Sequence, residues 1–314
     1  MEDSKIGWTK HTFNPFMGCT KVSPACDNCY AERDMDHRFG RVSWGAGQPR
    51  VRTSEKNWNK PRAWNKQAAA TREKIKVFCA SLSDVFDGEK TSDLDAWRKD
   101  LWRLIEETPN LYWLLLTKRP QNIRRMVPAH WLNKWPEHVW IGASAENQAM
   151  LDLRAPIIAS LPAKVRFLSC EPLLEPLDFG RWLGDHDCHA CNARFWGDDL
   201  REDHMVSVDF TDHGGESALD TCPRCGYDNT DEEDATVGFD NLEPGINWII
   251  AGGESGPGWR EMNMDWCRNI RDQCVSANVP FFLKQTSGNH PIKEPELDGR
   301  QWMECPEERF ALGV

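Results

Sequence analysis

The feature that most constrains the fold is a series of short apolar runs, each followed at once by small or polar residues. The runs are continuous rather than alternating, which is typical of parallel strands buried on both faces. Segments with apolar residues at helical spacing lie between them, at residues 92–107, 147–161 and 265–277. After a first strand within residues 8–14, the predicted strands cover residues 76–80, 111–116, 138–141, 165–168, 246–250 and 280–283.

This alternation of strands and helices predicts a parallel sheet. Without residues 184–243, the length of the chain is close to the roughly 250 residues of a (β/α)₈ barrel. We therefore expect a partial or full parallel (β/α) barrel formed by residues 1–183 and 244–314, with 184–243 as an inserted subdomain. A doubly wound open sheet is the alternative, because periodicity does not decide whether a sheet closes.

Three cysteines within eleven residues, Cys19, Cys26 and Cys29, lie in a loop that contains Gly18 and Pro24. Thiolates favour iron–sulfur clusters and zinc over hard cations. A four-iron cluster held by three protein thiolates keeps one iron open, which is the arrangement needed to bind and cleave S-adenosylmethionine. The alternative is that these are reduced cysteines without a metal, since free cysteine is among the most buried residue types.

Polar residues that follow parallel strands gather at the C-terminal edge of the sheet, where ligands bind. The three-cysteine loop follows the first predicted strand, so it should open onto the same face as these side chains. The sequence therefore predicts one active site that includes Ser81, Asp84, Lys118, Arg119, Glu146, Glu171, Glu254 and Lys284.

A second metal site is predicted in the insert, where Cys188 and Cys191 form one CxxC pair and Cys222 and Cys225 form another. Two such pairs supply the four thiolates of a closed, tetrahedral, structural zinc site. The insert has little apolar content of its own, so it needs the free energy of metal binding to fold. We therefore expect a zinc ribbon.

The net charge of −11 is concentrated in one segment. Residues 198–243 carry fifteen Asp and Glu against two Lys and Arg, so the remainder of the chain is nearly neutral. Within it, residues 38–76 carry eleven Lys and Arg against two Glu, together with Trp44, Trp58 and Trp64. Such a stretch either follows a nucleic-acid backbone and stacks on bases, or is a solvated loop whose tryptophans anchor the core.

The sequence also excludes several classes of protein. No stretch reaches 18 apolar residues, and the N-terminus lacks the apolar region of a signal peptide. Twelve cysteines in such a chain indicate metal sites rather than a disulfide framework. We expect a soluble, cytoplasmic protein with no membrane partner.

Ordered motifs resemble a known family. They are GCTKVSPACDNCYAE at 18–32, SLSDVF at 81–86, LTKRP at 116–120, GASAEN at 142–147, RFLSCEPLL at 166–174, GGESG at 252–256 and FFLKQ at 281–285. Together they resemble a phage-associated family that is named mainly for its three-cysteine motif and regarded as divergent radical S-adenosylmethionine proteins. Two features depart from the usual radical-SAM pattern: six residues rather than three separate the first two cysteines, and the aromatic Tyr30 follows the third cysteine.

The resemblance implies a radical-SAM-type partial barrel with a [4Fe–4S] cluster on Cys19, Cys26 and Cys29. In such enzymes the reduced cluster cleaves S-adenosylmethionine to methionine and a 5′-deoxyadenosyl radical, which takes a hydrogen atom from the substrate. The resemblance assigns no catalytic residue. The residues that would hold the rest of S-adenosylmethionine are Ser81, Ser83, Asp84, Lys118, Ser144, Glu146 and Glu254.

Two functions therefore remain open. The first is a radical S-adenosylmethionine enzyme, reduced by a partner such as a flavodoxin in the cytoplasm (the host's, if phage-encoded), that modifies a nucleic-acid base or nucleotide-linked group, with hypermodified phage DNA favoured. The second is a non-catalytic nucleic-acid-binding protein with two structural zinc sites.

Overall fold

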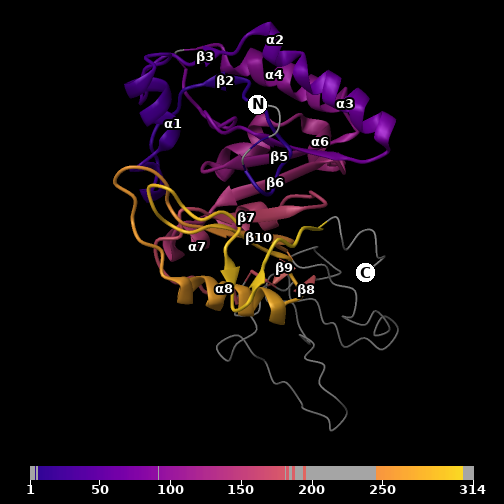
Figure 1. Cartoon of the computed structure of the whole chain (residues 1–314). Coiled ribbons are helices and arrows are strands. Elements are labelled where there is room, and N and C mark those ends of the chain that lie inside the picture. The colour runs from indigo at the N-terminus through magenta and orange to yellow at the C-terminus, as the bar shows by residue number, and fades with distance from the viewer. Residues whose placement is uncertain are drawn as a thin grey trace, which may run out of the picture.

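The computed structural model describes residues 4, 6–90, 92–180, 182–183, 186–187, 194–195 and 245–306. Its main feature is a seven-stranded parallel sheet curled into a half-barrel (Figure 1). The strands of this sheet, in their spatial order, are β1 (His11–Thr12), β4 (Ile75–Cys79), β5 (Leu111–Thr117), β6 (Val139–Ser144), β7 (Arg166–Cys170), β10 (Trp248–Gly252) and β11 (Phe281–Gln285).

The order of these strands in the sheet is their order in the sequence. A doubly wound sheet needs a point where the strand order reverses, so that alternative is wrong. The partial parallel barrel is confirmed, and each predicted strand is present within a few residues of its expected position. The continuous apolar runs identified these strands because all five residues of β7 and of β10 are buried.

Helices cover the convex side of the sheet, and the three long ones that the sequence predicts are present (Figure 1). Each begins at a side-chain cap: Asp93 accepts from the Ala96 amide, Asn147 from the Met150 amide, and Asn263 from the Asp265 amide. The helices are α1 (Tyr30–Glu32), α2 (Glu55–Trp58), α3 (Lys60–Thr71), α4 (Leu94–Glu106), α5 (Ile123–Met126), α6 (Ala129–Asn133), α7 (Gln148–Ala159) and α8 (Met264–Ser276).

Short elements complete the structure. Antiparallel pairs join β2 to β3, β8 to β9, and β12 to β13, while single turns of 3-10 or π helix lie at Pro24–Cys26, Arg33–Arg38 and Pro120–Asn122. The short strands are β2 (Phe16–Met17), β3 (Val51–Arg52), β8 (His186–Asp187), β9 (Arg194–Phe195), β12 (Glu296–Leu297) and β13 (Arg300–Gln301).

The predicted zinc site lies outside the described residues. All four of its cysteines, Cys188, Cys191, Cys222 and Cys225, fall in segments that the structure does not describe.

Two apolar cores lie on the two sides of the sheet. The larger packs the outward side chains of the strands against the helices. The smaller contains no helical residue and fills the concave side with Trp8, Phe78, Trp140, Phe167, Trp248 and Phe282 among its members. Toward the C-terminal end of the strands this aromatic filling gives way to polar residues, since Ser169 and Lys284 come two positions after Phe167 and Phe282.

The three tryptophans of the basic stretch lie in different environments. Trp58 and Trp64, at the end of α2 and within α3, are only 4% and 3% exposed and belong to the larger core, so for them the core-anchor interpretation is correct. Trp44 is half-buried and lines the pocket described below. Two of the three tryptophans of the stretch therefore anchor the core, and the third faces the pocket.

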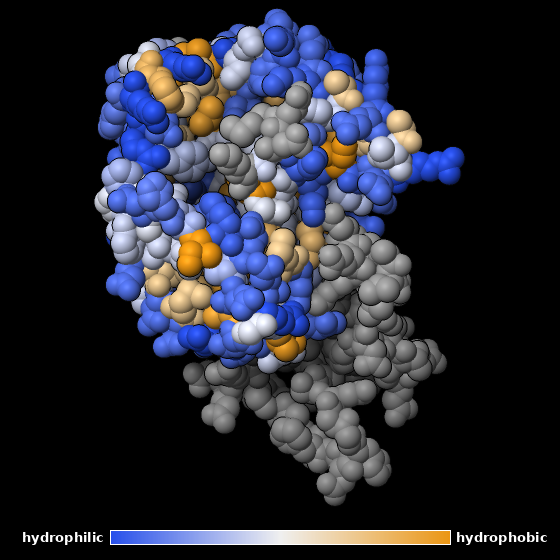
Figure 2. Space-filling model, in the orientation of Figure 1, coloured by the Kyte–Doolittle hydropathy of each residue, from blue (hydrophilic) through white to orange (hydrophobic). Residues whose placement is uncertain are grey.

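The surface carries no broad apolar patch on the face shown in Figure 2, where hydrophobic residues form small separate groups on a mainly hydrophilic background. Across the described residues, no helix combines the length and apolarity that crossing a membrane requires.

The close packing inside the half-barrel gives a test of the fold. A Cβ atom at Gly142 in β6 would lie 2.6 Å from the ring and the carbonyl oxygen of Phe167. We expect Gly142→Ala to destabilise the protein by about 1–3 kcal/mol, because the sheet must shift to relieve this overlap. Urea denaturation measures the loss; the matched control, Leu153→Ala on the exposed side of α7, should stay within about 0.5 kcal/mol of the parent. Equal stability of the two variants would contradict the described interior.

Candidate functional site

A pocket opens at the C-terminal edge of the sheet, between the strand ends and the cysteine loop, which we define as residues 18–29. Its non-atom space, open solvent at the mouth included, is about 940 Å³. The predicted site residues that line it are Cys19, Cys26, Cys29, Ser81, Ser83, Asp84, Lys118, Arg119, Ser144, Glu171 and Lys284. Glu146 and Glu254 are absent from this lining.

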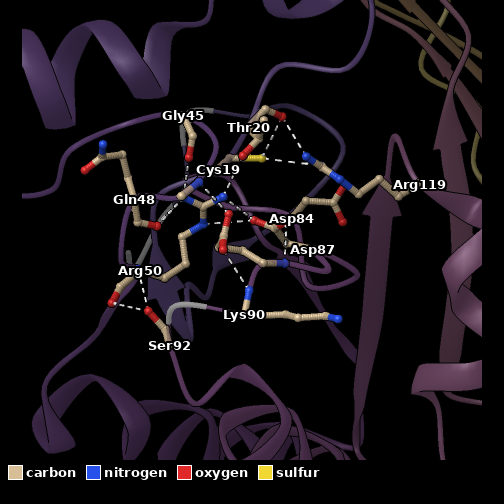
Figure 3. A network of polar contacts seen from close by, with 12 residues as sticks. Cys19, Thr20, Gly45, Gln48, Arg50, Asp84, Asp87, Lys90, Ser92 and Arg119 are labelled. Carbon is tan, nitrogen blue, oxygen red and sulfur yellow. Dashed lines mark hydrogen bonds and ion pairs between the residues drawn. The ribbon is translucent and has the colours of Figure 1, made fainter.

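The first cysteine is held from the end of β5. Arg119 Nη1 lies 3.5 Å from Cys19 Sγ, and Nη2 donates to the Thr20 carbonyl oxygen at 2.6 Å (Figure 3). The same guanidinium pairs with Asp84 at 3.0 Å, and that carboxylate also accepts from the Thr117 hydroxyl and the Lys118 amide. Asp84 therefore fixes the arginine that contacts Cys19.

A second arginine holds the segment after Cys19. Arg50 is buried and pairs with Asp87 at 2.8 Å, while its Nη2 donates to Thr20 Oγ1 at 2.7 Å (Figure 3). Its Nη1 donates to the carbonyl oxygens of Gly45 and Gln48. Arg50 thus joins the cysteine loop to the chain that follows α1.

The middle of the loop rests on Glu146, which follows β6. This carboxylate is fully buried, pairs with Arg154 of α7 at 2.9 Å, and accepts from the Ala25 amide at 3.1 Å. Burial by itself raises the pKa of Glu146, but Arg154 and the donated hydrogen bonds outweigh it and lower the pKa below its usual value. Glu146 is therefore an ionised anchor for the loop.

The far end of the loop is held from the turn after β10. Arg260 pairs with Glu254 through Nη2 and Nε, at 2.5 and 2.9 Å, and donates to the Pro24 carbonyl oxygen at 2.9 Å. Glu254 also accepts from Asn28 Nδ2 at 2.9 Å. Although burial opposes ionisation, the Arg260 and Asn28 hydrogen bonds lower the pKa of Glu254.

Three residues expected to hold S-adenosylmethionine thus contact something else. Asp84, Glu146 and Glu254 each pair with an arginine and hold the cysteine loop, directly or through that arginine. Their assignment as cofactor contacts stays a prediction. Sequence reasoning missed Arg50, Arg154 and Arg260 in this role, because none lies in a motif around the cysteines, and Arg154 and Arg260 lie far along the chain from the loop.

The three cysteines share the pocket without converging on one point. Among the residues that the structure describes, no three His, Cys, Asp or Glu side chains could hold a single metal ion. Burial raises the pKa of Cys19 to about 11, although the nearby Arg119 lowers it. Binding of a metal or cluster at Cys19 would therefore have to displace the proton of this thiol.

The glycines at the end of β10 serve close packing. A Cβ at Gly252 would lie 2.8 Å from Glu171 Oε1, and one at Gly253 would lie 2.2 Å from the Ser287 amide nitrogen. Close packing therefore explains both glycines.

Comparisons with known proteins give a family and no established activity. A family model described as a protein of unknown function (DUF5131) matches residues 3–306. The chain belongs to this family. The DUF5131 match covers the half-barrel, the cysteine loop and the insert in one span. The comparisons with curated proteins and with solved structures gave no match.

The arginine contacts make a prediction about the loop. Replacing Arg260 in Arg260→Gln leaves Glu254, which is 7% exposed, without its cation and removes the donor to Pro24. We expect amide hydrogen exchange within residues 19–29 to become roughly fivefold faster or more, while exchange in the sheet is unchanged. Arg268→Gln is the matched control, because Arg268 pairs only with Asp265 and Asp298 in the described contacts. Loop exchange equal in both variants would show that Arg260 does not hold the loop.

Proposed function

We propose that this chain is a radical S-adenosylmethionine enzyme whose [4Fe–4S] cluster binds Cys19, Cys26 and Cys29. The observation that carries the proposal is that all three cysteines of one short loop line a single pocket at the C-terminal edge of a parallel half-barrel. This edge is where ligands of parallel (β/α) folds bind. We also propose that the half-barrel is of the radical-SAM type.

The donor set fits a cluster better than a structural zinc ion. The described lining of the pocket contains three cysteines and no fourth, and it contains no histidine. Structural zinc sites are closed by four ligands, whereas a four-iron cluster bound by three cysteines keeps one iron for another ligand. A cluster also bonds each cysteine through a different iron, so its cysteines need not converge on a single point.

The residues of the chain would bind and orient S-adenosylmethionine, and they would exclude water from the site. The arginine–carboxylate pairs fix the loop, and the aromatic filling below the pocket keeps water out of the concave side of the sheet. When bound, the cluster would supply the electron that cleaves S-adenosylmethionine into methionine and a 5′-deoxyadenosyl radical. A reducing partner such as a flavodoxin would supply that electron in the cytoplasm.

The pocket offers further groups for S-adenosylmethionine. Ser81, Ser83, Lys118 and Ser144 line it, and Ser83 Oγ is buried without a hydrogen-bond partner in the described structure. A buried hydroxyl without a partner is costly, so a bound ligand that satisfies it is stabilised. These four residues are proposed cofactor contacts. Asp84, Glu146 and Glu254 also hold the loop, and their assignment as cofactor contacts stays a prediction.

The proposed substrate is a nucleic-acid base or a nucleotide-linked group, with a hypermodified base of phage DNA favoured. Trp44 from the basic stretch and Lys118 both line the pocket, so it offers such a substrate an aromatic ring and a cation. The insert, with Cys188, Cys191, Cys222 and Cys225, is proposed to fold around a structural zinc ion.

Metal analysis tests this proposal. After anaerobic reconstitution with iron and sulfide, we expect Cys19→Ala to lose the iron and its brown colour and to keep zinc, while Cys188→Ala loses zinc and keeps iron. The buried Cys267, outside both sites, supplies the control Cys267→Ala, which should keep both metals. Under reduction, the parent should release 5′-deoxyadenosine from S-adenosylmethionine, and Cys19→Ala should release none.

The contrary result is equally clear. A colourless parent that binds zinc at both sites, and salt-sensitive binding of nucleic acid without 5′-deoxyadenosine, would contradict the proposal and support the non-catalytic alternative.

A further inference from the structure

A fifth ion pair lies at the strand ends, and it differs from the four that hold the loop. Lys284 Nζ in β11 is 2.7 Å from Glu171 Oε1, just after β7, with the two side chains 19% and 11% exposed. Both side chains line the pocket, and their described hydrogen bonds and ion pairs do not include the cysteine loop. Holding the cysteine loop is therefore not the role of this pair.

The pair has hydrogen-bonding capacity left over. Glu171 Oε2 accepts from the Ser169 hydroxyl at 3.1 Å. Although Oε1 is close to the ammonium of Lys284, it has no donor in hydrogen-bond geometry within the described structure. An ammonium group has three donors, and a carboxylate oxygen has two lone pairs. Oε1 is buried against Lys284 and Gly252, so the capacity left for a ligand is that of the ammonium and of Oε2, which the Ser169 hydroxyl uses only in part.

The backbone is shaped to keep the carboxylate in this place. A Cβ atom at Gly252 in the adjacent β10 would lie 2.8 Å from Glu171 Oε1 and 3.4 Å from its Cδ. A side chain at this position would overlap the carboxylate, so Gly252 leaves the space that Glu171 occupies.

The surroundings of the pair suit a flat, neutral group. Trp8 and Phe78 line the pocket from the aromatic core, and Tyr30 and Trp44 line it from the loop side. Aromatic rings favour stacking with planar ligands. Glu171 balances the charge of Lys284. A phosphate or carboxylate at the pair would therefore be repelled by the Glu171 carboxylate, whereas a neutral ring would not be repelled.

We infer that Lys284 and Glu171 recognise a nucleobase through an edge where a carbonyl oxygen stands beside an N–H, as in guanine, thymine and uracil. The ammonium donates to the carbonyl oxygen, and Glu171 accepts from the N–H through Oε2, beside the Ser169 hydroxyl. This inference rests on the proposed function, in which the pocket receives a nucleic-acid base, and it specifies the base by its hydrogen-bonding edge.

The test compares nucleosides that differ only in this edge. Guanosine and thymidine are titrated into the full chain, purified anaerobically and without S-adenosylmethionine, alongside 1-methylguanosine and 3-methylthymidine, which lack the N–H. Quenching of tryptophan fluorescence, with Trp8 and Trp44 in the pocket, reports binding. We expect the unmethylated nucleosides to bind roughly tenfold tighter or more than their methylated forms.

Variants assign the effect to the pair. Lys284→Met and Glu171→Gln should each weaken binding of guanosine and thymidine about tenfold and remove the discrimination against the methylated forms. Lys293→Met is the matched control, because Lys293 contacts Gln285 of the same strand and does not line the pocket. Should the pocket variants fail to fold by circular dichroism, the methylated nucleosides still decide the question on the parent chain.

Three results would overturn the inference: equal binding of methylated and unmethylated nucleosides, parent-like binding by Lys284→Met, or binding of nucleoside 5′-phosphates alone that inorganic phosphate displaces. Release of 5′-deoxyadenosine is measured separately, without nucleoside. If it occurs and nucleosides are not discriminated, only this inference fails. If the edge is discriminated and no 5′-deoxyadenosine or iron is found, the proposed function fails and the binding site stands.

Discussion

The position of the cysteine loop depends on four arginine–carboxylate pairs, each of which takes its carboxylate from the segment after a strand of the half-barrel. Arg50–Asp87, Arg119–Asp84, Arg154–Glu146 and Arg260–Glu254 reach the loop at Thr20, Cys19, Ala25 and Pro24 respectively. Breaking one partner of a buried pair costs about 3–5 kcal/mol, since the other charge is left without compensation. The loop is thus joined to several strands at once.

This arrangement explains why the loop can keep its thiols in place with little regular structure of its own. Only Pro24–Cys26 forms a helical turn within residues 18–29. The backbone groups of the loop find their partners in side chains and strand ends instead, as the Ala25 amide does at Glu146 and the Gly18 amide does at the Leu82 carbonyl oxygen. Rigid positioning of reactive groups on a preformed scaffold is what a bound cofactor needs.

The sequence could predict the strands and the edge at which the site lies, but not how the site is assembled. Runs such as 111–116 are apolar throughout because the strand is buried on both faces, and this signal is local. The partners of the loop are not local: Arg260 contacts Pro24 across 236 positions. A carboxylate after a strand can face the pocket or the loop, and nothing in the sequence around Glu146 or Glu254 distinguishes these two orientations.

The central claim is that the cysteine loop holds a cluster with one iron open to S-adenosylmethionine. Electron paramagnetic resonance of the reconstituted, reduced protein tests it most directly, recorded with and without S-adenosylmethionine. We expect a cluster signal that changes when S-adenosylmethionine is added, because the ligand would bind the iron that no cysteine occupies. A cluster signal that is identical with and without S-adenosylmethionine, or no signal in a protein that contains only zinc, would contradict the account.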